Sequence, residues 1–335
     1  MTAAPPEQPV TLLLSRRDVA RLMRPRDYLE AVEAGFKAAA EGRAAAPAPL
    51  SIEGVGGAFH AKGAAMRSDR HYAALKLNGN FPDNKSGLPT VQGAILLCDA
   101  ENGALLAVMD SIEVTLRRTA AATALAARHL ARAQSETLLI CGCGAQGLVQ
   151  LEALADVLPL KRCIAWDRDA GRAERLAALA AGRLGLDARA ATDVAQWSET
   201  CDVIVTCTTA ARPFLHASHV SPGTFVAAVG ADSPSKCEIH PELMAKARVV
   251  VDSLEQCLDM GDLRHAVAAG AMRMEHVHAA LEDLVAGRSA GRTDDAEIFL
   301  FDSTGTALQD VAAAAAIYAR AAGQAGFRTM AFGAA

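Results

Sequence analysis

The stretch Thr137-Leu138-Leu139-Ile140-Cys141-Gly142-Cys143-Gly144-Ala145-Gln146-Gly147 decides the fold of this chain. Its first part, up to Cys141, predicts a buried strand, and the remainder fits the pattern G-x-G-x-x-G. The glycines permit a tight turn and let the backbone approach a pyrophosphate, whose charge the amides at the next helix N-terminus would meet. A helix is predicted after the turn from apolar residues at helical spacing, namely Leu148, Leu151, Leu154, Ala155 and Leu158.

An acidic residue follows the next predicted strand at the distance typical of a dinucleotide site. Asp167 comes directly after the strand expected at residues 162–166, about 20 positions after Gly147. A carboxylate there would accept hydrogen bonds from ribose hydroxyls and repel a 2′-phosphate, which favours NAD(H), while Arg168 beside it leaves NADP(H) open. The predicted cofactor-binding residues of this region are Gly142, Gly144, Ala145, Gln146, Gly147, Asp167 and Arg168.

Length, composition and charge limit the class of protein. The chain has 335 residues, enough for about two domains that each bury a core. It contains no run of about 18 apolar residues, so we expect no membrane partner. Its net charge of -5, without a basic block, argues against a nucleic-acid partner. The start of the sequence lacks the pattern of a secretory signal, so we expect a cytoplasmic protein whose cysteines are reduced.

Neither the cysteines nor the histidines have the spacing of a metal site. Cys141 and Cys143 form one C-x-C, without the second pair or nearby histidine that a four-ligand zinc site needs. His276 and His278 form an H-x-H with no further ligand at a suitable distance, and surface positions are expected for them. The sequence therefore predicts no metal.

Before and after the glycine turn the hydrophobic patterns differ. The N-terminal part predicts a helix at 25–40, loops and short strands at 44–63, strands at 72–77, 90–98 and 105–109, a loop at 78–84, and a long helix that starts at a capping box formed by Asp110 and Glu113. The later part predicts strands at 137–141, 162–166, 202–206, 224–229, 248–252 and 297–301 that alternate with helices, which is typical of a parallel sheet. An Ala-rich helix at 304–322 could pack on the first domain and make it discontinuous.

Polar residues in three parts of the chain are candidates for binding or catalysis. Lys76 stands between Leu75 and Leu77 in an apolar strand, either facing a cleft or lying on a wet face. Arg117 and Arg118 point about 100° apart on a helix, so either one faces inward to bind a carboxylate or both are solvated. Two strand ends, 206–209 and 230–232, lie where ligands gather in open sheets, and Asp232 is a general acid/base candidate or a loop cap.

Taken together, the motifs of this chain resemble those of the ornithine cyclodeaminase/mu-crystallin family. The resemblance covers nearly the whole chain and implies an α/β protein: a Rossmann NAD-binding domain of residues 133–303 and a discontinuous α+β substrate-binding and dimerisation domain of residues 1–132 and 304–335, assembled as a homodimer. The motifs that carry it are Lys76-Leu77-Asn78-Gly79-Asn80-Phe81-Pro82, Gly87-Leu88-Pro89-Thr90, Arg118-Thr119-Ala120-Ala121, the glycine turn 142–147, Gly230-Ala231-Asp232 and Phe301-Asp302-Ser303-Thr304-Gly305.

The resemblance also implies roles for individual residues. Lys76 and Arg118 would hold the carboxylate of the substrate near the nicotinamide, and Asp232 would act as acid/base at the reacting amine or imine. Two cations then fix an amino-acid carboxylate while an aspartate handles the proton that accompanies hydride transfer. By the same resemblance, neighbours of the cofactor or pocket are Thr90, Thr206, Val229 and Ser303.

The sequence departs from the cyclodeaminase pattern where the side chain of the substrate would lie. An acid expected there to bind a distal ammonium is replaced by His60, and Pro49 replaces a cation beside the carboxylate. A histidine beside Lys62 suits a small, polar or acidic side chain. We therefore expect an NAD(H)-dependent amino-acid dehydrogenase or imine (ketimine) reductase acting on a small amino, imino or oxo acid. The alternatives are an ornithine cyclodeaminase that forms proline and ammonia, and a non-catalytic NAD(P)H or small-ligand binding protein.

Overall fold

A computed structural model describes residues 10–84 and 87–332. The chain divides into two compact units, which are described separately. The first unit comprises Met1–Arg118 and Thr306–Ala335, and the second comprises Thr119–Gly305. The helix α3 (Ser111–Leu130) contributes its first part to the first unit and the remainder to the second. The domain limits at 132/133 and 303/304 that the sequence suggests stay a prediction.

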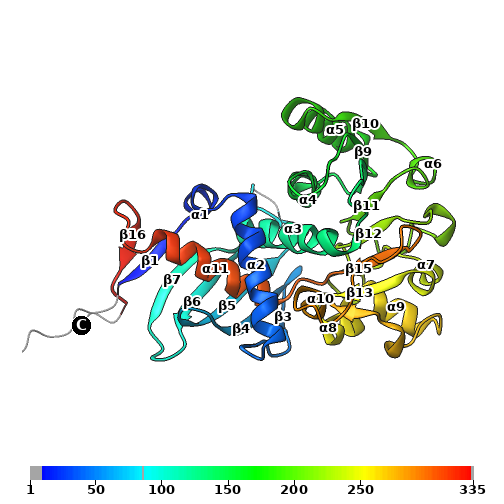
Figure 1. The fold of residues 1–335 in the computed structure, drawn as a ribbon. Helices are drawn as coiled ribbons and strands as arrows, with labels where there is room; N and C mark the ends of the chain where they lie inside the picture. The colour runs from blue at the N-terminus through cyan, green and yellow to red at the C-terminus, as the bar shows by residue number, and fades with distance from the viewer. Residues whose placement is uncertain (1–9, 85–86, 333–335) are drawn as a thin grey trace, which may run out of the picture. The chain divides into compact units, whose positions relative to one another are not determined.

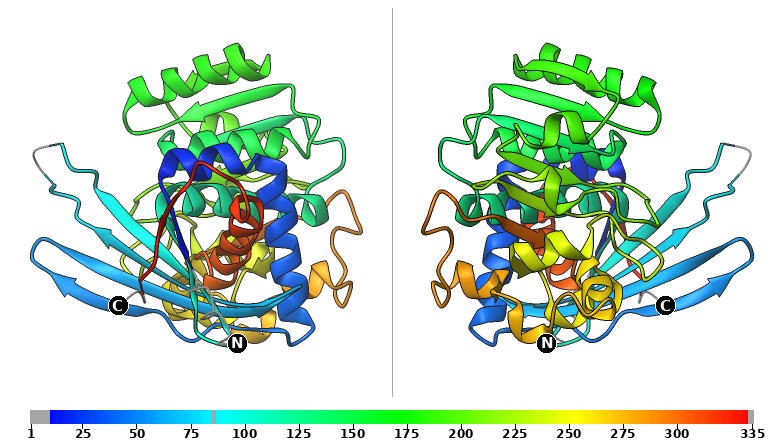
Figure 2. Two further views of the ribbon diagram at one scale, coloured as in Figure 1. Left: turned by 90° about the vertical axis from the view of Figure 1, so that its left-hand side faces the viewer. Right: turned by 90° about the vertical axis from the view of Figure 1, so that its right-hand side faces the viewer.

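The first unit is a mixed sheet with helices packed on one face. The strands lie in the order β16-β1-β7-β6-β5-β4-β2, and β3 pairs with β4. α11 packs along α2 and over β4, β5 and β6 (Figures 1 and 2). The elements are β1 (Thr11–Leu14), α1 (Arg16–Leu22), α2 (Pro25–Ala40), β2 (Ala44–Ala45), β3 (Leu50–Gly54), β4 (Gly57–Arg67), β5 (His71–Asn80), β6 (Val91–Asp99), β7 (Leu105–Asp110), α11 (Ala307–Ala321) and β16 (Arg328–Met330).

Small residues allow α2 and α11 to lie close together. A methyl group added to Gly35 of α2 would come 3.0 Å from the Cβ of Ala312 on α11, so the helix faces fit only without larger side chains. Tyr28 and Phe36, predicted to share a helix face, are both buried. The predicted capping by Asp110 is also present, because its Oδ1 accepts the amides of Ile112 (3.1 Å) and Glu113 (2.9 Å) where α3 begins.

Two expectations for the first unit were wrong in extent. Asn78, Gly79 and Asn80, expected in a loop, continue β5, because their backbones pair with β4 on one side and β6 on the other. The loop begins only at Phe81. The segment 44–63, expected to hold loops and short strands, contributes part of the long strand β4. Backbone pairing on both sides outweighs the turn-forming tendency of Asn and Gly here.

The second unit is a parallel sheet with crossover helices. Its strand order is β10-β9-β8-β11-β12-β15-β13-β14, and each neighbouring pair is parallel. The elements are β8 (Thr137–Cys141), α4 (Ala145–Ala155), β9 (Arg162–Trp166), α5 (Ala170–Leu184), β10 (Asp187–Ala191), α6 (Ala195–Ser198), β11 (Val203–Thr206), η1 (Ala217–His219), β12 (Phe225–Ala228), α7 (Pro241–Lys246), β13 (Arg248–Val251), α8 (Leu254–Met260), α9 (Asp262–Ala268), η2 (Met274–His276), β14 (Ala279–Ala280), α10 (Leu281–Val285) and β15 (Phe299–Asp302).

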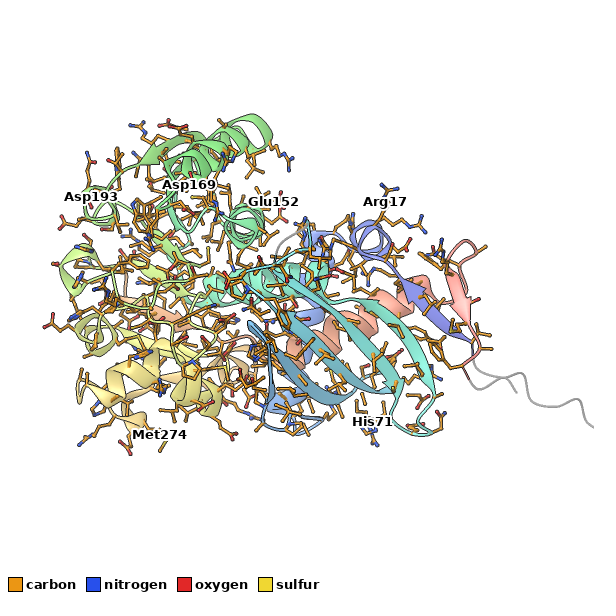
Figure 3. The ribbon with its side chains drawn as sticks, turned by 180° about the vertical axis from the view of Figure 1, so that it is seen from behind. Arg17, His71, Glu152, Asp169, Asp193 and Met274 are labelled. Carbon is orange, nitrogen blue, oxygen red and sulfur yellow. The ribbon has the colours of Figure 1, made fainter. Side chains whose placement is uncertain are left out.

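The predicted central strands lie where the sequence placed them, within about two residues at each end. β8 and β9 have the expected limits, because both are continuous apolar runs. The edge strand β10 was missed, since its residues are mostly exposed and carry no apolar run. Charged side chains such as Asp169 and Asp193 lie on the outside of this unit (Figure 3).

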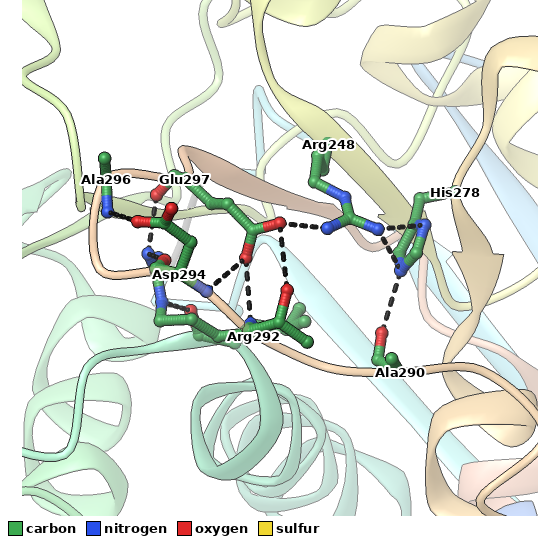
Figure 4. Close-up of polar contacts among 9 residues, drawn as sticks. Arg248, His278, Ala290, Arg292, Asp294, Ala296 and Glu297 are labelled. Carbon is green, nitrogen blue, oxygen red and sulfur yellow. Dashed lines mark hydrogen bonds and ion pairs between the residues drawn. The ribbon is translucent and has the colours of Figure 1, made fainter.

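A network of polar side chains lies at the end of this sheet where β13 and β15 begin. Arg248 donates to Glu297 and to the ring of His278, and His278 in turn contacts the carbonyl of Ala290 at 2.8 Å (Figure 4). Glu297 also accepts the amides of Thr293 and Asp294. His278 of the H-x-H therefore has protein partners. Among the residues that the structure describes, no group of three or more His, Cys, Asp or Glu side chains is arranged to hold a metal ion.

Candidate active site

Lys76 lies at the centre of the first unit's sheet, on the face that carries α11. The alternation along β5 buries Lys76 while its neighbours Leu75 and Leu77 are exposed on the opposite face. Its ammonium lies 2.7 Å from Oδ2 of Asp310 on α11 and 3.5 Å from Oγ1 of Thr115 on α3. The side chain is 4% exposed, so it does not lie on a wet face of the strand.

Arg118 approaches the same aspartate from α3. Its Nε donates to Oδ1 of Asp310 at 3.0 Å and its Nη1 donates to Oε1 of Gln309 at 2.8 Å. Arg117, one position earlier, instead forms an ion pair with Glu113 at 3.0 Å and is more exposed. Arg118 is therefore the inward-facing member of the pair, and one carboxylate bridges the two cations predicted to bind the substrate.

The charges of this cluster do not balance. Among the described residues, Lys76 and Arg118 share one carboxylate, that of Asp310. Lys62 of β4 lies opposite Lys76 in the strand register, on the same face of the sheet. Burial lowers the pKa of Lys76 to about 7, with the nearby Arg118 and Lys62 adding to the effect, while Asp310 opposes it. Burial would raise the pKa of Asp310, but Lys76 and Arg118 hold that pKa below its usual value. The cluster is thus an anion site that a second carboxylate would neutralise.

His60 lies near this cluster on the same strand as Lys62. Its register partner on β5 is Asn78, and strand alternation places His60, Lys62 and Lys76 on one face. His60 is exposed, and its Nδ1 lies 3.4 Å from the hydroxyl of Ser51. Its role in a side-chain pocket stays a prediction, as does that of Thr90, which is exposed just before β6.

The glycine turn of the second unit has the form a dinucleotide needs. Gly142 has a φ of 104°, which favours glycine, and a methyl group at Gly147 would come 2.2 Å from the carbonyl oxygen of Gly142. Gly144 caps α4, and a methyl group there would meet open space. Gln146 carries a buried Nε2 that has no partner among the described residues. An exposed backbone at a helix N-terminus with a spare donor fits a pyrophosphate.

The carboxylate of Asp167 accepts a hydrogen bond from the backbone of the same turn. Its Oδ2 accepts the amide of Cys143 at 2.8 Å and its Oδ1 accepts the amide of Asp169 at 2.9 Å. The carboxylate is therefore fixed beside the glycine turn at the end of β9, where a ribose hydroxyl would be bound. Arg168 next to it is exposed.

The strand ends place the other predicted residues at one edge of this sheet. Thr206 ends β11 and is buried, and its carbonyl accepts the amide of Val229 at 2.8 Å. Asp232 lies in the loop after β12 with a side chain that is 57% exposed, and its Oδ1 lies 2.5 Å from Nζ of Lys236. Ser303, after β15, donates to Asp252 at 3.0 Å.

Sequence reasoning missed four polar residues of these clusters. Asp310 and its neighbour Gln309 are a polar pair inside an otherwise Ala-rich helix, which was the available signal. Lys236 stands four positions after Asp232, in a loop without periodicity. Glu238 is fully buried between apolar neighbours Cys237 and Ile239, as Lys76 is between leucines.

The chain belongs to the ornithine cyclodeaminase/mu-crystallin family, whose model matches residues 9–325. It is 38% identical over 312 residues to alanine dehydrogenase of Archaeoglobus fulgidus, covering 93% of this chain and 95% of that protein. It is 35% identical over 309 residues to iminosuccinate reductase of Paracoccus denitrificans, covering 91% and 95%. These matches confirm the family predicted from the motifs.

Solved structures confirm the predicted fold class. An archaeal alanine dehydrogenase dimer with bound NAD superposes with a TM-score of 0.91 at 37% identity, covering 96% of this chain and 99% of that chain. Thermococcus litoralis Delta(1)-pyrroline-2-carboxylate reductase, in complex with NADH and L-proline, gives a TM-score of 0.89 at 32% identity, covering 93% and 97%. The names of these relatives agree with the enzyme class predicted from the sequence. Within the described part of this chain, no helix is long and apolar enough to cross a membrane.

Proposed function

We propose that this chain is an NAD(H)-dependent oxidoreductase that interconverts a small L-amino acid and its imino or oxo acid. The observation that carries the proposal is the buried cluster of Lys76, Arg118 and Asp310, which has a surplus of positive charge. A carboxylate is the part that amino, imino and oxo acids share. A buried anion site in a member of this family therefore suits the substrate end of the reaction, and the glycine turn suits the cofactor end.

The chain's residues would bind, orient and move protons. When bound, the nicotinamide accepts or returns a hydride at the Cα of the substrate. The ammonium of Lys76 and the guanidinium of Arg118 would bind the substrate carboxylate, held in place by Asp310. Asp232 would take a proton from the amine as the imine forms and return it in the reverse direction. Water then converts the imine to an oxo acid and ammonia.

Charge near the cluster favours some substrate side chains over others. Lys62 and His60 lie on the same sheet face as Lys76. A distal ammonium of ornithine would meet the ammonium of Lys62 there, whereas a small, polar or acidic side chain would not be repelled. We therefore favour a dehydrogenase or imine reductase over an ornithine cyclodeaminase.

We also propose that the protein is a homodimer built on the uncovered face of the first unit's sheet. The register pairs Leu75 with Leu96 and Ile52 with Phe59, and all four are exposed large apolar residues on the face opposite Lys76. An apolar patch of this kind on a sheet is typical of a protein–protein contact. The similar alanine dehydrogenase is a dimer.

The cofactor preference and the compartment are further parts of the proposal. Asp167 disfavours a 2′-phosphate, so NAD(H) is the expected cofactor, and Arg168 is the residue that would have to accommodate NADP(H). Eight free cysteines, five of them buried, suit the reducing conditions of the cytoplasm.

A substrate panel with two readouts tests this function. Ornithine, lysine, alanine, aspartate, cyclic imino acids, and oxo acids with ammonia or methylamine are each followed by nicotinamide absorbance and by product analysis. Net NADH consumption with an imine or oxo acid would support the proposal and identify the side chain that is accepted. Proline and ammonia from ornithine, without net change in NADH, would instead indicate a cyclodeaminase. NADH binding without any turnover would indicate a ligand-binding protein.

A further inference from the structure

Glu238 is a buried carboxylate that binds the ends of two neighbouring strands. Its Oε1 accepts the amide of Thr208 at 2.6 Å, and its Oε2 accepts the hydroxyl of Thr206 at 2.7 Å and the amide of Gly230 at 2.8 Å. Thr206 ends β11, and Gly230 lies two residues after the end of β12. One side chain therefore fixes the backbone at both places where these strands leave the sheet.

The same side chain closes the loop that carries Asp232. The loop starts at Gly230 and ends at Glu238, so the Glu238–Gly230 hydrogen bond joins its two ends. The approach is close, because a methyl group on Gly230 would lie 2.5 Å from the carboxylate of Glu238. Backbone bonds from Phe214 and Leu215 to the carbonyl of Glu238 hold the residue itself in place. The conformation of this loop thus depends on Glu238.

A second buried carboxylate supports the first. Oδ1 of Asp262, the first residue of α9, accepts the amides of Glu238 at 2.8 Å and Ile239 at 3.0 Å. Asp302, at the end of β15, accepts the amides of Asp262 at 3.3 Å and Leu263 at 2.9 Å. The hydrogen bonds of the buried residues Glu238, Asp262 and Asp302 thus connect the carboxyl ends of β11, β12 and β15.

We propose that Glu238 is a positioning residue that sets the geometry of the nicotinamide end of the cofactor site and of Asp232. The inference rests on the proposed function, because that function assigns Thr206, Val229 and Asp232 to the site. Glu238 does not need to touch substrate or cofactor, since it acts through Thr206, Thr208 and Gly230. Its ionised form accepts all three hydrogen bonds, and protonation of either oxygen weakens that set.

The surroundings of Glu238 make its charge depend on pH near neutrality. Burial raises the pKa of Glu238 to about 7, and the like charge of Asp262 adds to the rise, while the hydrogen bonds from Thr208 and Thr206 oppose it. Four ionisable groups of the described chain face Glu238: Asp262 on α9, the thiol of Cys141 on β8, the thiol of Cys207 after β11, and the adjacent Cys237. Asp262 itself faces His265 and Asp302. The strand ends are therefore held most firmly above about pH 7.

The test compares wild-type protein with Glu238→Gln, which keeps the size of the side chain but replaces one acceptor oxygen with a donor. NADH affinity is measured by fluorescence titration from pH 5.5 to 8.5, together with kcat and KM. For wild type we expect NADH affinity to fall as pH drops through about 7. For Glu238→Gln we expect a loss of about tenfold or more in NADH affinity or kcat at pH 8, and no such pH dependence. Glu242→Gln, an exposed glutamate on α7, is the control and should match wild type.

A second variant keeps the test decisive if Glu238→Gln fails to fold. Thr206→Val removes one hydrogen bond that stabilises the ionised carboxylate, so the pH at which NADH affinity falls should move upward. An unchanged pH profile in Thr206→Val, or wild-type affinity and kcat in a folded Glu238→Gln, would overturn the inference. If wild-type protein binds no NADH, the proposed function fails instead. If it binds NADH but turns over nothing, the binding profile still decides the role of Glu238.

Discussion

The ammonium of Lys76 lies 2.7 Å from Oδ2 of Asp310, and the other oxygen of that carboxylate receives the guanidinium of Arg118. These residues come from β5, α11 and α3, so the C-terminal helix supplies the carboxylate that holds two cations of the N-terminal part. Asp310 keeps both side chains in fixed positions and offsets only part of their charge. The substrate carboxylate would then enter a preorganised site.

Replacing Asp310 with Asn should weaken substrate binding through Lys76. The loss of the carboxylate removes the group that opposes the burial effect, so the pKa of Lys76 falls further and the amine is neutral at pH 7. We expect KM for the amino or imino acid to rise several-fold at pH 6 to 7, where wild-type Lys76 still carries charge, and the difference to shrink at pH 8, where the wild-type amine is already largely neutral. Breaking a buried ion pair also costs about 3–5 kcal/mol of stability. Steady-state kinetics and thermal unfolding check both effects, with the exposed Glu30→Gln as control; equal KM values in Asp310→Asn and wild type would contradict the role.

The affinity for the substrate carboxylate should fall as pH rises through about 7. The pKa of Lys76 is lowered from 10.5 to about 7 in the folded protein, so the ammonium is present below this pH and is lost above it. A competitive carboxylate inhibitor measured from pH 5.5 to 9 should therefore bind more weakly on the alkaline side. This direction is opposite to that expected for NADH, whose site is held by ionised Glu238. A carboxylate affinity that stays constant over this range would show that Lys76 does not titrate there.

Asp167→Ala should weaken NADH binding by at least about tenfold, since it removes both the ribose acceptor and the hydrogen bond that holds the amide of Cys143. The preference for NADH over NADPH should decline in parallel. The matched control is Asp169→Asn, an exposed acid two positions later that caps α5. Fluorescence titration with both cofactors measures the effect. If Asp167→Ala and Asp169→Asn bind NADH equally well, Asp167 does not contact the ribose.

The sequence predicted the fold well where the pattern is local. The apolar runs of β8 and β9, the glycines of the turn and the capping by Asp110 depend on neighbouring residues, and their positions agree with the structure. β10 and the far end of β5 could not be found in this way, because pairing with other strands decides them.

The candidate site was predicted only in part, for a related reason. Lys76 stood out against its apolar neighbours, but its partner Asp310 comes from the last helix, and no local pattern links the two. Glu238 was missed although it is buried like Lys76, since its three hydrogen-bond donors lie on two other segments. Residues that act through long-range contacts need the folded chain to be recognised.

Asp232→Asn should lower kcat at least about a hundredfold while NADH still binds, because an amide cannot take a proton from the substrate amine. Lys236, whose Nζ lies 2.5 Å from the carboxylate, would remain in place to preserve the loop. Single-turnover absorbance and NADH titration separate the chemical step from binding. Asp193→Asn, an exposed acid of the same unit, serves as the control. A kcat within a few fold of wild type would remove Asp232 from the acid/base role.

The double variant Leu75→Arg and Leu96→Arg should convert the dimer to a monomer. These side chains pair directly across β5 and β6 and are exposed on the sheet face opposite Lys76, so two added charges would have to be buried in a contact between copies. Light scattering after size exclusion should give half the wild-type mass. Leu88→Arg introduces the same charge at an exposed leucine in the loop before β6 and should leave the mass unchanged. Because Lys76 lies next to Leu75 on β5, the monomer should also lose affinity for the substrate carboxylate more than for NADH. A double variant that keeps the wild-type mass would place the contact on another face of the protein.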